Sequence, residues 1–518
     1  MRDIDFGLEK SYILLFFSVF ILSFSHRPVP RTFYVATTGN DQNDGLSPAT
    51  AWQSLAKLNQ QNFEAGDQIL LQGNAVFKGF ISLTQEDAGT PEQPVTIQSF
   101  GTGRATIQNA DSTAIQILNA GGIVVKDLIL SGIDRTKNRG FGLQLLNTLP
   151  NANKCKAIQV ENITAASFGR DGIFVGGQPQ DGSQSGFEDV KISHCEMFDN
   201  QYHGLFVTGF WDTNAKGYAN KNLHITHCTA HDNTGDPFFL ENHSGSGMEI
   251  DDVENALIEY CVAHNNGYLC NSKVGGPCGI WLHAANKSII QHCVSVNNRT
   301  GRGLDGAGFD LDGGTTNCII QHCYARDNDG AGILVWNYNT APHELSHNII
   351  RFNVLENNGR KNFYADLHIG TDGTPIHHFE IHNNTIYSSP QPGAKAHCLA
   401  ITDGQNEHFN VHHNLFISNG TPLLSIDKKQ NDVRFNQNAY WATNKRFEVT
   451  DNKVVYRSLA DWQRATQQEK EGLYGKPKCG ALGTTELPEV TQIKSLKAYH
   501  PLPNSPLLRN GKPCIGAF

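Results

Sequence analysis

The chain has no excess of positive charge: 41 Lys and Arg residues stand against 50 Asp and Glu residues, which gives a formal net charge of −9. Proteins that bind nucleic acid normally present a basic surface, so this composition disfavours a nucleic-acid partner. The chain also contains no Cys-x-x-Cys pair, which argues against a zinc ribbon. An acidic polysaccharide would need a local cation to bind to this surface.

A hydrophobic run long enough to cross a membrane is also missing. The main apolar run covers residues 12–24, and its 13 residues are too few for a span but suit the core of a signal peptide. We therefore expect residues 1–25 to direct export, which predicts a secreted, periplasmic or cell-surface protein with no integral membrane span after processing. A retained N-terminal anchor is the alternative, and no Cys follows the run to carry a lipid.

Six short segments of the chain follow one template. Each begins with Gly and places apolar residues at its second and fourth positions. They read Gly172-Ile-Phe-Val-Gly, Gly204-Leu-Phe-Val-Thr, Gly247-Met-Glu-Ile-Asp, Gly279-Ile-Trp-Leu-His, Gly308-Phe-Asp-Leu-Asp and Gly332-Ile-Leu-Val-Trp. Successive side chains of a β-strand point to opposite faces, so positions two and four build a core while positions three and five face outward.

A second series recurs in step with the first, every 30 to 33 residues. Its members read Ile192-Ser-His-Cys, Ile225-Thr-His-Cys, Ile258-Glu-Tyr-Cys, Ile290-Gln-His-Cys, Ile320-Gln-His-Cys, Ile350-Arg-Phe-Asn, Ile381-His-Asn-Asn and Val411-His-His-Asn. Repeats of this length indicate a solenoid, and no segment between them suits a crossover helix, so equivalent strands stack directly as parallel ladders. The Cys and Asn positions then form an interior column of small residues.

An Asn follows five residues after each of the first six members of this series. These residues are Asn200, Asn233, Asn266, Asn298, Asn328 and Asn358. Stacking places them on top of one another, which predicts a ladder of asparagine side chains at a turn of the coil.

Residues 33–52, 65–69 and 89–97, together with residues 308–314 and 327–332, resemble secreted bacterial proteins of the right-handed parallel β-helix, or pectate-lyase-like, superfold. The resemblance runs from about residue 33 to the C-terminus. It implies an all-β, right-handed parallel β-helix solenoid with a short N-terminal capping helix. It leaves the activity open, because this fold hosts lyases, hydrolases, epimerases and adhesins.

We divide the chain into a signal peptide at 1–25, an N-terminal entry and cap module at 33–110, β-helix core repeats at 111–440 and a C-terminal cap and tail at 441–518. The apolar stripe of Trp52, Leu55 and Leu58 predicts the capping helix, and residues 458–463 predict another short helix. The Pro-rich tail is expected to pack along the outside of the coil. We expect a monomer.

Twelve cysteines in an exported chain suggest disulfides. Five of them, however, occupy the stacked column, where parallel Cβ vectors suit a bridge poorly, and we expect buried free thiols there. Two pairings stay open: Cys270 with Cys278 across a Gly-rich loop, and Cys479 with Cys514 in the tail.

The outward template positions form two columns in stacking order. The first column holds Phe206, Glu249, Trp281, Asp310 and Leu334, the second holds Thr208, Asp251, His283, Asp312 and Trp336, and a further rung at 364–368 is expected to continue them with Asp366 and His368. Like charges stacked in register destabilise a sheet, and no Lys or Arg interrupts these columns, so selection for stability alone would avoid the arrangement. Crowding is expected to raise at least one carboxyl pKa, as a general acid requires.

These columns supply the candidate site. The candidate catalytic residues are Glu249, Asp251, His283, Asp310 and Asp312, and the candidate substrate-binding residues are Trp281, Trp336, Asp366 and His368. The structural alternative is that the carboxylates are merely solvated or close turns, as Asp312 before two glycines would. The tryptophans would then pack under a neighbouring loop.

Strand geometry places Asp310 and Asp312 about 6.6 Å apart at the backbone, and Asp251 and Asp312 about 9.6 Å apart across two rungs. Inverting glycosidases hold their two carboxyl groups about 6.5 to 9.5 Å apart, and retaining ones about 5 to 5.5 Å apart. The spacing therefore favours an exported carbohydrate-active enzyme that cleaves a polysaccharide or oligosaccharide by inverting hydrolysis.

Two alternatives stay open. The first is a Ca²⁺-assisted polysaccharide lyase, in which Glu249, Asp251, Asp310 and Asp312 would hold the ion through their oxygens. The absence of Lys or Arg from the columns counts against the lyase, because its mechanism commonly uses one of them as the base. The second is a non-catalytic glycan-binding or cell-surface structural protein. No cofactor other than Ca²⁺ is indicated.

Overall fold

The structure, a computed structural model, describes residues 29–402, 406–444, 446–480, 496, 499–509, 512–513 and 515–517. The signal peptide expected at residues 1–25 lies outside these residues. Among the described residues, no helix is both long and apolar enough to cross a membrane.

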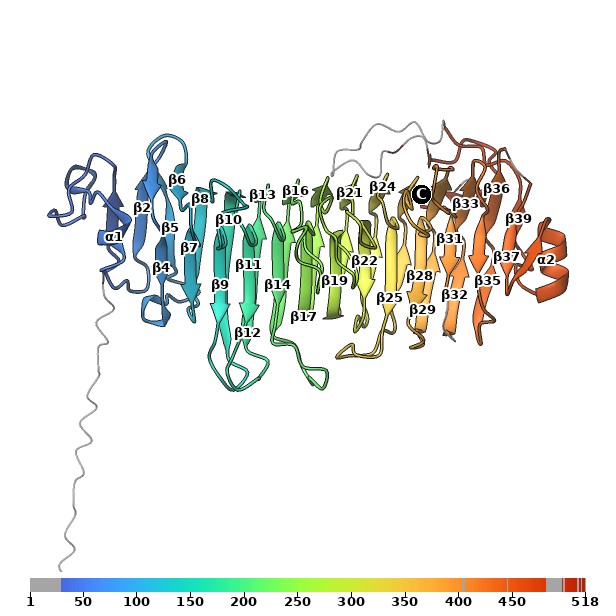
Figure 1. Cartoon of the computed structure of the whole chain (residues 1–518), viewed down its shortest axis with the longest axis horizontal. Helices are drawn as coiled ribbons and strands as arrows, with labels where there is room; N and C mark the ends of the chain where they lie inside the picture. The colour runs from blue at the N-terminus through green and yellow to red at the C-terminus, as the bar shows by residue number, and fades with distance from the viewer. Residues whose placement is uncertain are drawn as a thin grey trace, which may run out of the picture.

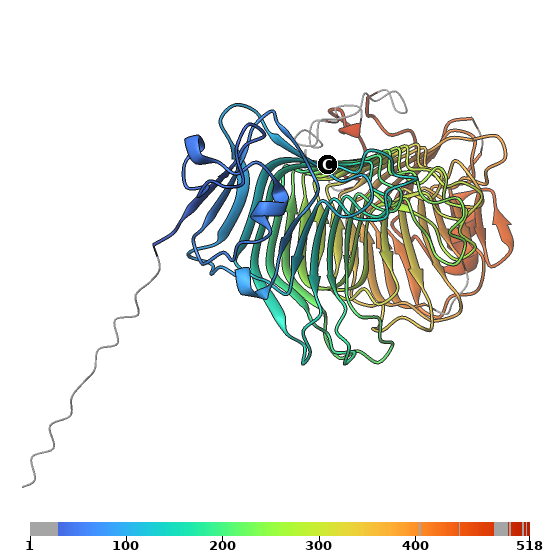
Figure 2. The same cartoon turned by 60° about the vertical axis from the view of Figure 1, so that its left-hand side comes forward.

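The chain winds into a parallel β-helix, as predicted, whose turns stack from the blue N-terminal end to the orange C-terminal end (Figures 1 and 2). Within the 39-stranded sheet, strands between the two ends of the coil pair in parallel with their equivalents one turn before and one turn after them. Three faces therefore run along the coil. Four long strands turn a corner and serve two faces. β8 (Ile123–Ser131) and β10 (Lys154–Ala166) join the first and second faces, and β17 (Met248–Glu259) and β19 (Cys278–Asn286) join the third and first.

The first face consists of β1 (Thr32–Val35), β2 (Gln68–Gln72), β5 (Val95–Phe100), β8 (Ile123–Ser131), β10 (Lys154–Ala166), β12 (Gly186–Ser193), β15 (Asn220–Thr226), β17 (Met248–Glu259), β20 (Ile289–Gln291), β23 (Ile319–Gln321), β26 (Ile349–Arg351), β29 (His377–His382), β32 (Glu407–His412) and β35 (Val433–Asn436). The second face adds β3 (Val76–Lys78), β6 (Ala105–Gln108), β13 (Glu196–Phe198), β16 (Thr229–His231), β18 (Val262–His264), β21 (Val294–Val296), β24 (Tyr324–Arg326), β27 (Val354–Glu356), β30 (Thr385–Ser388), β33 (Leu415–Ser418), β36 (Ala439–Ala442) and β39 (Leu473–Tyr474). The third face adds β4 (Ile81–Leu83), β7 (Ile115–Leu118), β9 (Leu143–Asn147), β11 (Ile173–Gly177), β14 (Leu205–Thr208), β19 (Cys278–Asn286), β22 (Ala307–Asp312), β25 (Ile333–Asn337), β28 (Leu367–Thr371), β31 (Leu399–Ile401), β34 (Leu424–Ile426), β37 (Val449–Asp451) and β38 (Val454–Tyr456). Outside the faces lie α1 (Leu55–Leu58), α2 (Leu459–Thr466), two 3₁₀ turns (Pro48–Thr50 and Gln85–Asp87) and the hairpin of β40 (Leu508–Arg509) and β41 (Lys512–Pro513).

The core is the inside of the coil, as the template predicts. Val207, Ile250, Leu282, Leu311 and Val335 occupy the fourth template position in consecutive rungs, and all are fully buried. Burial of a side chain of this size contributes about 1.5–3 kcal/mol. Because every rung repeats the pattern, the register between rungs is fixed along the whole third face.

The predicted asparagine ladder also lies inside the coil. Each amide nitrogen from Asn200 onward donates to the side-chain oxygen of the next asparagine, as far as Asn358, over 2.8 to 3.0 Å. The template glycines leave room for the ladder, because a Cβ at Gly247 would lie 3.0 Å from the amide nitrogen of Asn266.

The cysteine column is interior, as predicted. Its thiols are buried and donate to backbone carbonyls, as Cys261 does to the oxygen of Glu259 at 3.3 Å. No disulfide joins any of the described cysteines, and Cys270 and Cys278 are separate buried thiols. Cys514 lies outside the described residues, so its pairing with Cys479 stays a prediction.

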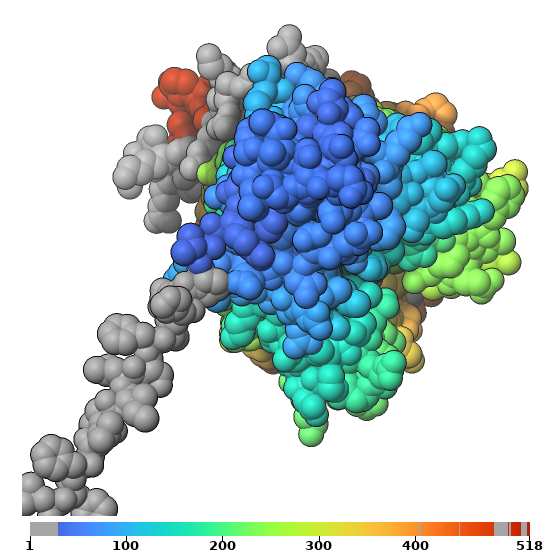
Figure 3. Space-filling view, turned by 90° about the vertical axis from the view of Figure 1, so that its left-hand side faces the viewer, coloured from blue at the N-terminus to red at the C-terminus, as the bar shows by residue number. Residues whose placement is uncertain are grey.

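Both ends of the coil are covered. At the N-terminal end, Ser54 caps α1, which buries Leu55 and Leu58, and Figure 3 shows the blue residues covering this end. At the C-terminal end, Ser458 caps α2, which buries Trp462. Each predicted helix therefore exists at an end of the solenoid.

The described part of the tail lies along the outside of the second face, as predicted. Leu507 and Ile515 share one buried apolar cluster with Val294 and Val354 of that face.

Candidate functional site

The two predicted columns exist on the third face in the predicted register. The first column runs through β14, β17, β19, β22 and β25 as Phe206, Glu249, Trp281, Asp310 and Leu334. In the second column Asp251 pairs with His283, and Asp312 pairs with Trp336. The four carboxylates therefore lie within three consecutive rungs.

The next rung differs from the prediction in its register. β28 pairs with β25 so that His368 follows Leu334 in the first column, and Gly370 follows Trp336 in the second. His368 is fully buried, and burial lowers its pKa to about 3, with His397 adding to the effect. It is therefore neutral at physiological pH.

The prediction that Asp366 continues the outward columns is wrong. Asp366 stands where the template has Gly, opposite Gly332, and its side chain is fully buried. Its carboxylate accepts hydrogen bonds from the backbone nitrogen of Asn358 at 2.6 Å and from the side-chain nitrogen of the same residue at 3.0 Å. A side chain at the glycine position points toward the ladder, so Asp366 ends the ladder and does not reach the site.

Loops enclose the acidic cluster. Glu249, Asp251, His283 and Asp310 are only 3% to 8% exposed. The hollow beside Asp251, bordered by loop residues 209–215 and 342–343, measures about 10 Å³. The cluster is therefore shielded from water, which strengthens the electrostatic interactions within it.

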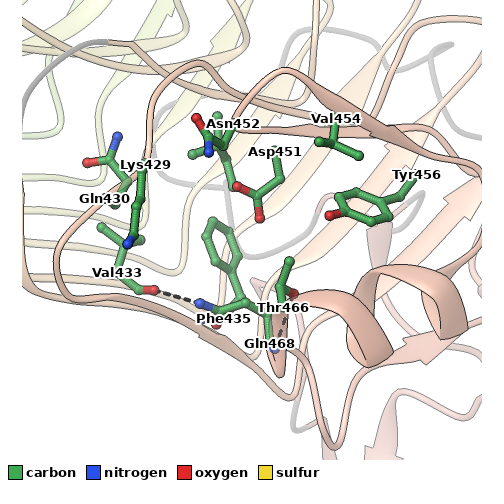
Figure 4. A pocket seen from close by; sticks show the side chains of 11 residues that line it. Lys429, Gln430, Val433, Phe435, Asp451, Asn452, Val454, Tyr456, Thr466 and Gln468 are labelled. Atoms are coloured by element: carbon green, nitrogen blue, oxygen red, sulfur yellow. Dashed lines mark hydrogen bonds between the residues drawn. The ribbon is translucent and has the colours of Figure 1, made fainter.

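A larger hollow of about 300 Å³ lies at the C-terminal end, between β35, β37 and α2 (Figure 4). Its lining includes one carboxylate, Asp451, which accepts a hydrogen bond from the indole of Trp462 at 2.9 Å. This hollow holds no pair of carboxyl groups and lies several rungs from the acidic columns.

Asp310 and Asp312 differ in their electrostatic surroundings. Burial, followed by the charges of Asp312 and Asp305, raises the pKa of Asp310 well above its ordinary value. Burial also raises the pKa of Asp312, but the nearby His283 opposes the rise and leaves it at about 6. Near neutral pH, Asp310 therefore keeps its proton while Asp312 is mostly ionised.

His283 links several parts of the site. Its Nδ1 lies 2.9 Å from Oδ1 of Asp251, and its Nε2 is hydrogen-bonded to the hydroxyl of Tyr338. Burial lowers the pKa of His283, but the charge and close contact of Asp251, together with the charges of Asp312 and Glu249, raise the pKa to about 9. Trp211, which is 47% exposed, stacks on the imidazole with ring centroids 5.3 Å apart.

A second histidine group surrounds Glu249. Nδ1 of His203 bonds Oδ1 of Asp171 at 2.7 Å, and its Nε2 lies 3.1 Å from Oε2 of Glu249 without hydrogen-bond geometry. Burial lowers the pKa of His203, but Asp171 and Glu249 raise it to about 9. Nδ1 of His243 lies 3.7 Å from the same Glu249 oxygen.

The described part of the chain contains two groups of three or more potential metal ligands within 4.8 Å of one another, namely His203 with His243 and Glu249, and His231 with Asp232 and His264. The four carboxylates considered for Ca²⁺ do not form such a group. The geometry of the described residues therefore gives no support to Ca²⁺ at that position.

The two predicted tryptophans differ in accessibility. Trp281 is 3% exposed and belongs to a small apolar cluster, and its indole nitrogen donates to Oγ of Ser246 at 3.2 Å. Trp336 is only half-buried, and its ring lies roughly parallel to that of His368, with centroids 6.4 Å apart. An aromatic face for a ligand is thus offered by Trp336 and by Trp211, but not by Trp281.

Sequence reasoning missed several residues of the site, namely Asp171, His203, Trp211, His243 and Tyr338. Asp171 and His203 each stand immediately before a template Gly, so extending the template by one residue would have revealed a third column. Trp211, His243 and Tyr338 come from loops between strands, which carry no repeat. No pattern in the sequence indicated them.

The family model described as "Right handed beta helix region" matches residues 98–268 and 149–355, which include every rung of the site up to β25. The chain is a right-handed β-helix protein. This confirms the resemblance seen in the sequence and the handedness that it implies.

Two proteins that are similar to this β-helix protein are lacto-N-biosidases. One, from Bifidobacterium longum subsp. longum, is 33% identical over 73 residues, and the match covers 14% of this chain and only 5% of that relative. The crystal structure of the GH136 lacto-N-biosidase from Eubacterium ramulus is 16% identical, with a TM-score of 0.52 over 73% of this chain and 68% of that one. At this level of identity the structural likeness shows the fold alone.

Proposed function

We propose that the chain is a carbohydrate-active enzyme that hydrolyses glycosidic bonds with inversion. The observation that carries this proposal is the pairing of Asp310 with Asp312. Both side chains lie on one face of the strand, with Cα atoms about 6.6 Å apart, and this spacing leaves room for the carboxyl separation of about 6.5 to 9.5 Å that inverting glycosidases use. Their surroundings separate their pKa values, which is how an acid and a base are distinguished at one pH.

Asp310 is the proposed general acid. Its raised pKa keeps a proton available for the leaving-group oxygen. Asp312 is the proposed general base, because a carboxyl with a pKa of about 6 is ionised near neutral pH and can accept a proton from water. His283, held between Asp251 and Tyr338, acts as a positioning residue that favours the ionised form of Asp312.

Binding of a sugar requires the loops over the cluster to open. The hollow beside Asp251 is about 10 Å³, whereas small-molecule sites are usually about 300–1,000 Å³. Loop 209–219 carries the exposed Trp211, which is suited to stack on a sugar ring as the loop admits it. Trp336 would offer a second aromatic face on the other side of Asp312.

A screen of polysaccharides and oligosaccharides with two readouts tests the proposal. Hydrolysis gives new reducing ends, whereas elimination also gives unsaturated uronides that absorb in the ultraviolet. A lacto-N-bioside belongs in the panel because both of the similar proteins are named for that activity. Reducing ends without ultraviolet absorbance, released by the wild type but not by Asp310→Asn, would support inverting hydrolysis once the anomer is determined by NMR.

Unsaturated products would overturn hydrolysis in favour of a lyase. Binding of glycans without cleavage would favour a non-catalytic protein.

A further inference from the structure

We propose that His203, His243 and Glu249 form a binding site for one transition-metal ion, most suitably Zn²⁺. The site lies at the edge of the acidic columns and uses three side chains that have no part in the proposed hydrolytic mechanism. Glu249 would then be a ligand, and neither acid nor base.

The three ligand atoms are spaced as a bound ion requires. Oε2 of Glu249 lies 3.1 Å from Nε2 of His203 and 3.7 Å from Nδ1 of His243, and all three atoms lie within 4.8 Å of one another. Zinc–ligand bonds of about 2.1 Å in a tetrahedral site set neighbouring ligand atoms about 3.4 Å apart. The distances of 3.1 Å and 3.7 Å from the Glu249 oxygen lie on either side of that value, so small side-chain rotations would complete the site.

None of these three atoms makes a hydrogen bond, and the ion-pair contact of 3.1 Å between His203 and Glu249 is one that a metal ion would replace. His203 Nε2, His243 Nδ1 and Glu249 Oε2 are all buried and have no hydrogen-bond partner. An orphaned buried polar atom is costly, and here three of them converge on one point. A metal ion would satisfy all three at once.

Asp171 holds His203 in the orientation that a ligand needs. Its Oδ1 accepts from Nδ1 of the imidazole at 2.7 Å, so that Nε2 faces Glu249 and is the nitrogen that would bind the ion. Histidines that bind metals commonly donate their other ring nitrogen to a carboxylate in this way. Phe206 packs against the same imidazole, with ring centroids 4.7 Å apart, and limits access of water.

The other group of potential metal ligands, His231 with Asp232 and His264, lacks this convergence. The rings of His231 and His264 stack 4.8 Å apart at an interplanar angle of 5°, so their in-plane lone pairs run parallel. The rings of His203 and His243 meet at 72° instead, which lets two lone pairs point to one position. Only the first group is therefore proposed as a site.

The donor set selects the class of ion. Two imidazoles and one carboxylate suit Zn²⁺ and related transition metals, whereas Ca²⁺ takes six to eight oxygen ligands. A set of three protein ligands also leaves a fourth position for water or a ligand oxygen.

Zinc titration of the metal-free full chain in competition with a chromophoric chelator tests the proposal. We expect one Zn²⁺ per chain, and Co²⁺ in its place should give the visible bands of a tetrahedral nitrogen–oxygen site. His243→Ala and Glu249→Gln should each weaken binding at least about 10-fold, and Asp171→Asn by about 10- to 100-fold through its effect on His203.

His264→Ala is the matched control and should leave zinc affinity unchanged. Thermal unfolding in EDTA checks that each variant folds, and His243→Ala is the decisive one because His243 lies in a loop between β16 and β17. Failure of the wild type to bind zinc would overturn the proposal, as would affinity that is unchanged in both His243→Ala and Glu249→Gln. Binding is measured without sugar, so this result is independent of the hydrolysis assay.

Discussion

Asp310 and Asp312 show how a strand can give two identical side chains different chemistry. They lie two residues apart on β22 and share one face, but only Asp312 has the positively charged His283 close enough to favour its ionised form. Asp310 lies deeper, and the thiol of Cys278 is 3.8 Å from its Oδ2. The difference in pKa follows from position, because the covalent structures are the same.

Replacement of the proposed acid should abolish turnover without unfolding the protein. Asp310→Asn keeps the shape of a protonated carboxyl, so we expect kcat to fall by about 10²- to 10⁴-fold, the usual contribution of general acid catalysis, while the thermal transition stays unchanged. Asp111→Asn, at an exposed position far from the site, is the control. Full activity of Asp310→Asn would remove this residue from the mechanism.

The pH profile should report the proposed base. Asp312 acts when ionised, so kcat/KM should decline as pH falls below about 6. Because His283 lowers the pKa of Asp312, His283→Gln should move this acidic limb to higher pH. An acidic limb that stays in place in this variant would argue against Asp312 as the base.

Trp336 should contribute to binding more than to bond cleavage. Its half-buried ring faces away from the core, so Trp336→Ala should raise KM more than it lowers kcat and leave the fold intact. Steady-state kinetics on the substrate found by the screen give both constants. A variant with lower thermal stability and unchanged KM would instead show that the ring only packs.

At the scale of the strand, the third face followed directly from the sequence. A period of two within each strand and a glycine at the start of each rung fix both the face and the register, so the neighbours of Asp310 were predictable. The exception, Asp366, arises where the glycine is missing. The loop residues His243 and Tyr338 were not predictable, because loop conformation follows from tertiary contacts and carries no repeat.

The end of the asparagine ladder should make stability depend on pH. Burial raises the pKa of Asp366 to about 7, above its ordinary 3.8, so the folded protein holds a proton that the unfolded chain releases. The free energy of unfolding from this group therefore falls as pH rises from about 4 to about 7, by at most about 1.4 kcal/mol per pH unit.

Asp366→Asn keeps the acceptor oxygen for Asn358 and removes the titration. The free energy of unfolding of the variant minus that of the wild type, measured with denaturant, should be larger at pH 8 than at pH 5. Glu469→Gln should respond in the same direction, because burial also raises the pKa of Glu469 to about 7. An equal difference from the wild type at both pH values would contradict this account of the ladder.

At the scale of the whole molecule, each rung contacts only its neighbours, so stability is approximately a sum of local terms and the ends are the weakest points. α2 protects one end. Trp462 is fully buried, its indole nitrogen donates to Asp451 at 2.9 Å, and its ring meets that of Phe435 edge-on with centroids 5.5 Å apart.

Loss of this cap should therefore loosen the coil from one end. Trp462→Ala should cost about 3–5 kcal/mol locally, as expected for removal of a buried aromatic side chain. Hydrogen exchange should accelerate in β35 to β39 and stay unchanged in β17 to β22, where the acidic columns lie. Arg464→Ala, on the same helix but with a side chain that is 78% exposed and a weak surface ion pair, should change neither region. Uniformly faster exchange along the coil would mean that the solenoid unfolds as one cooperative unit, and that its end caps govern the stability of the distant site.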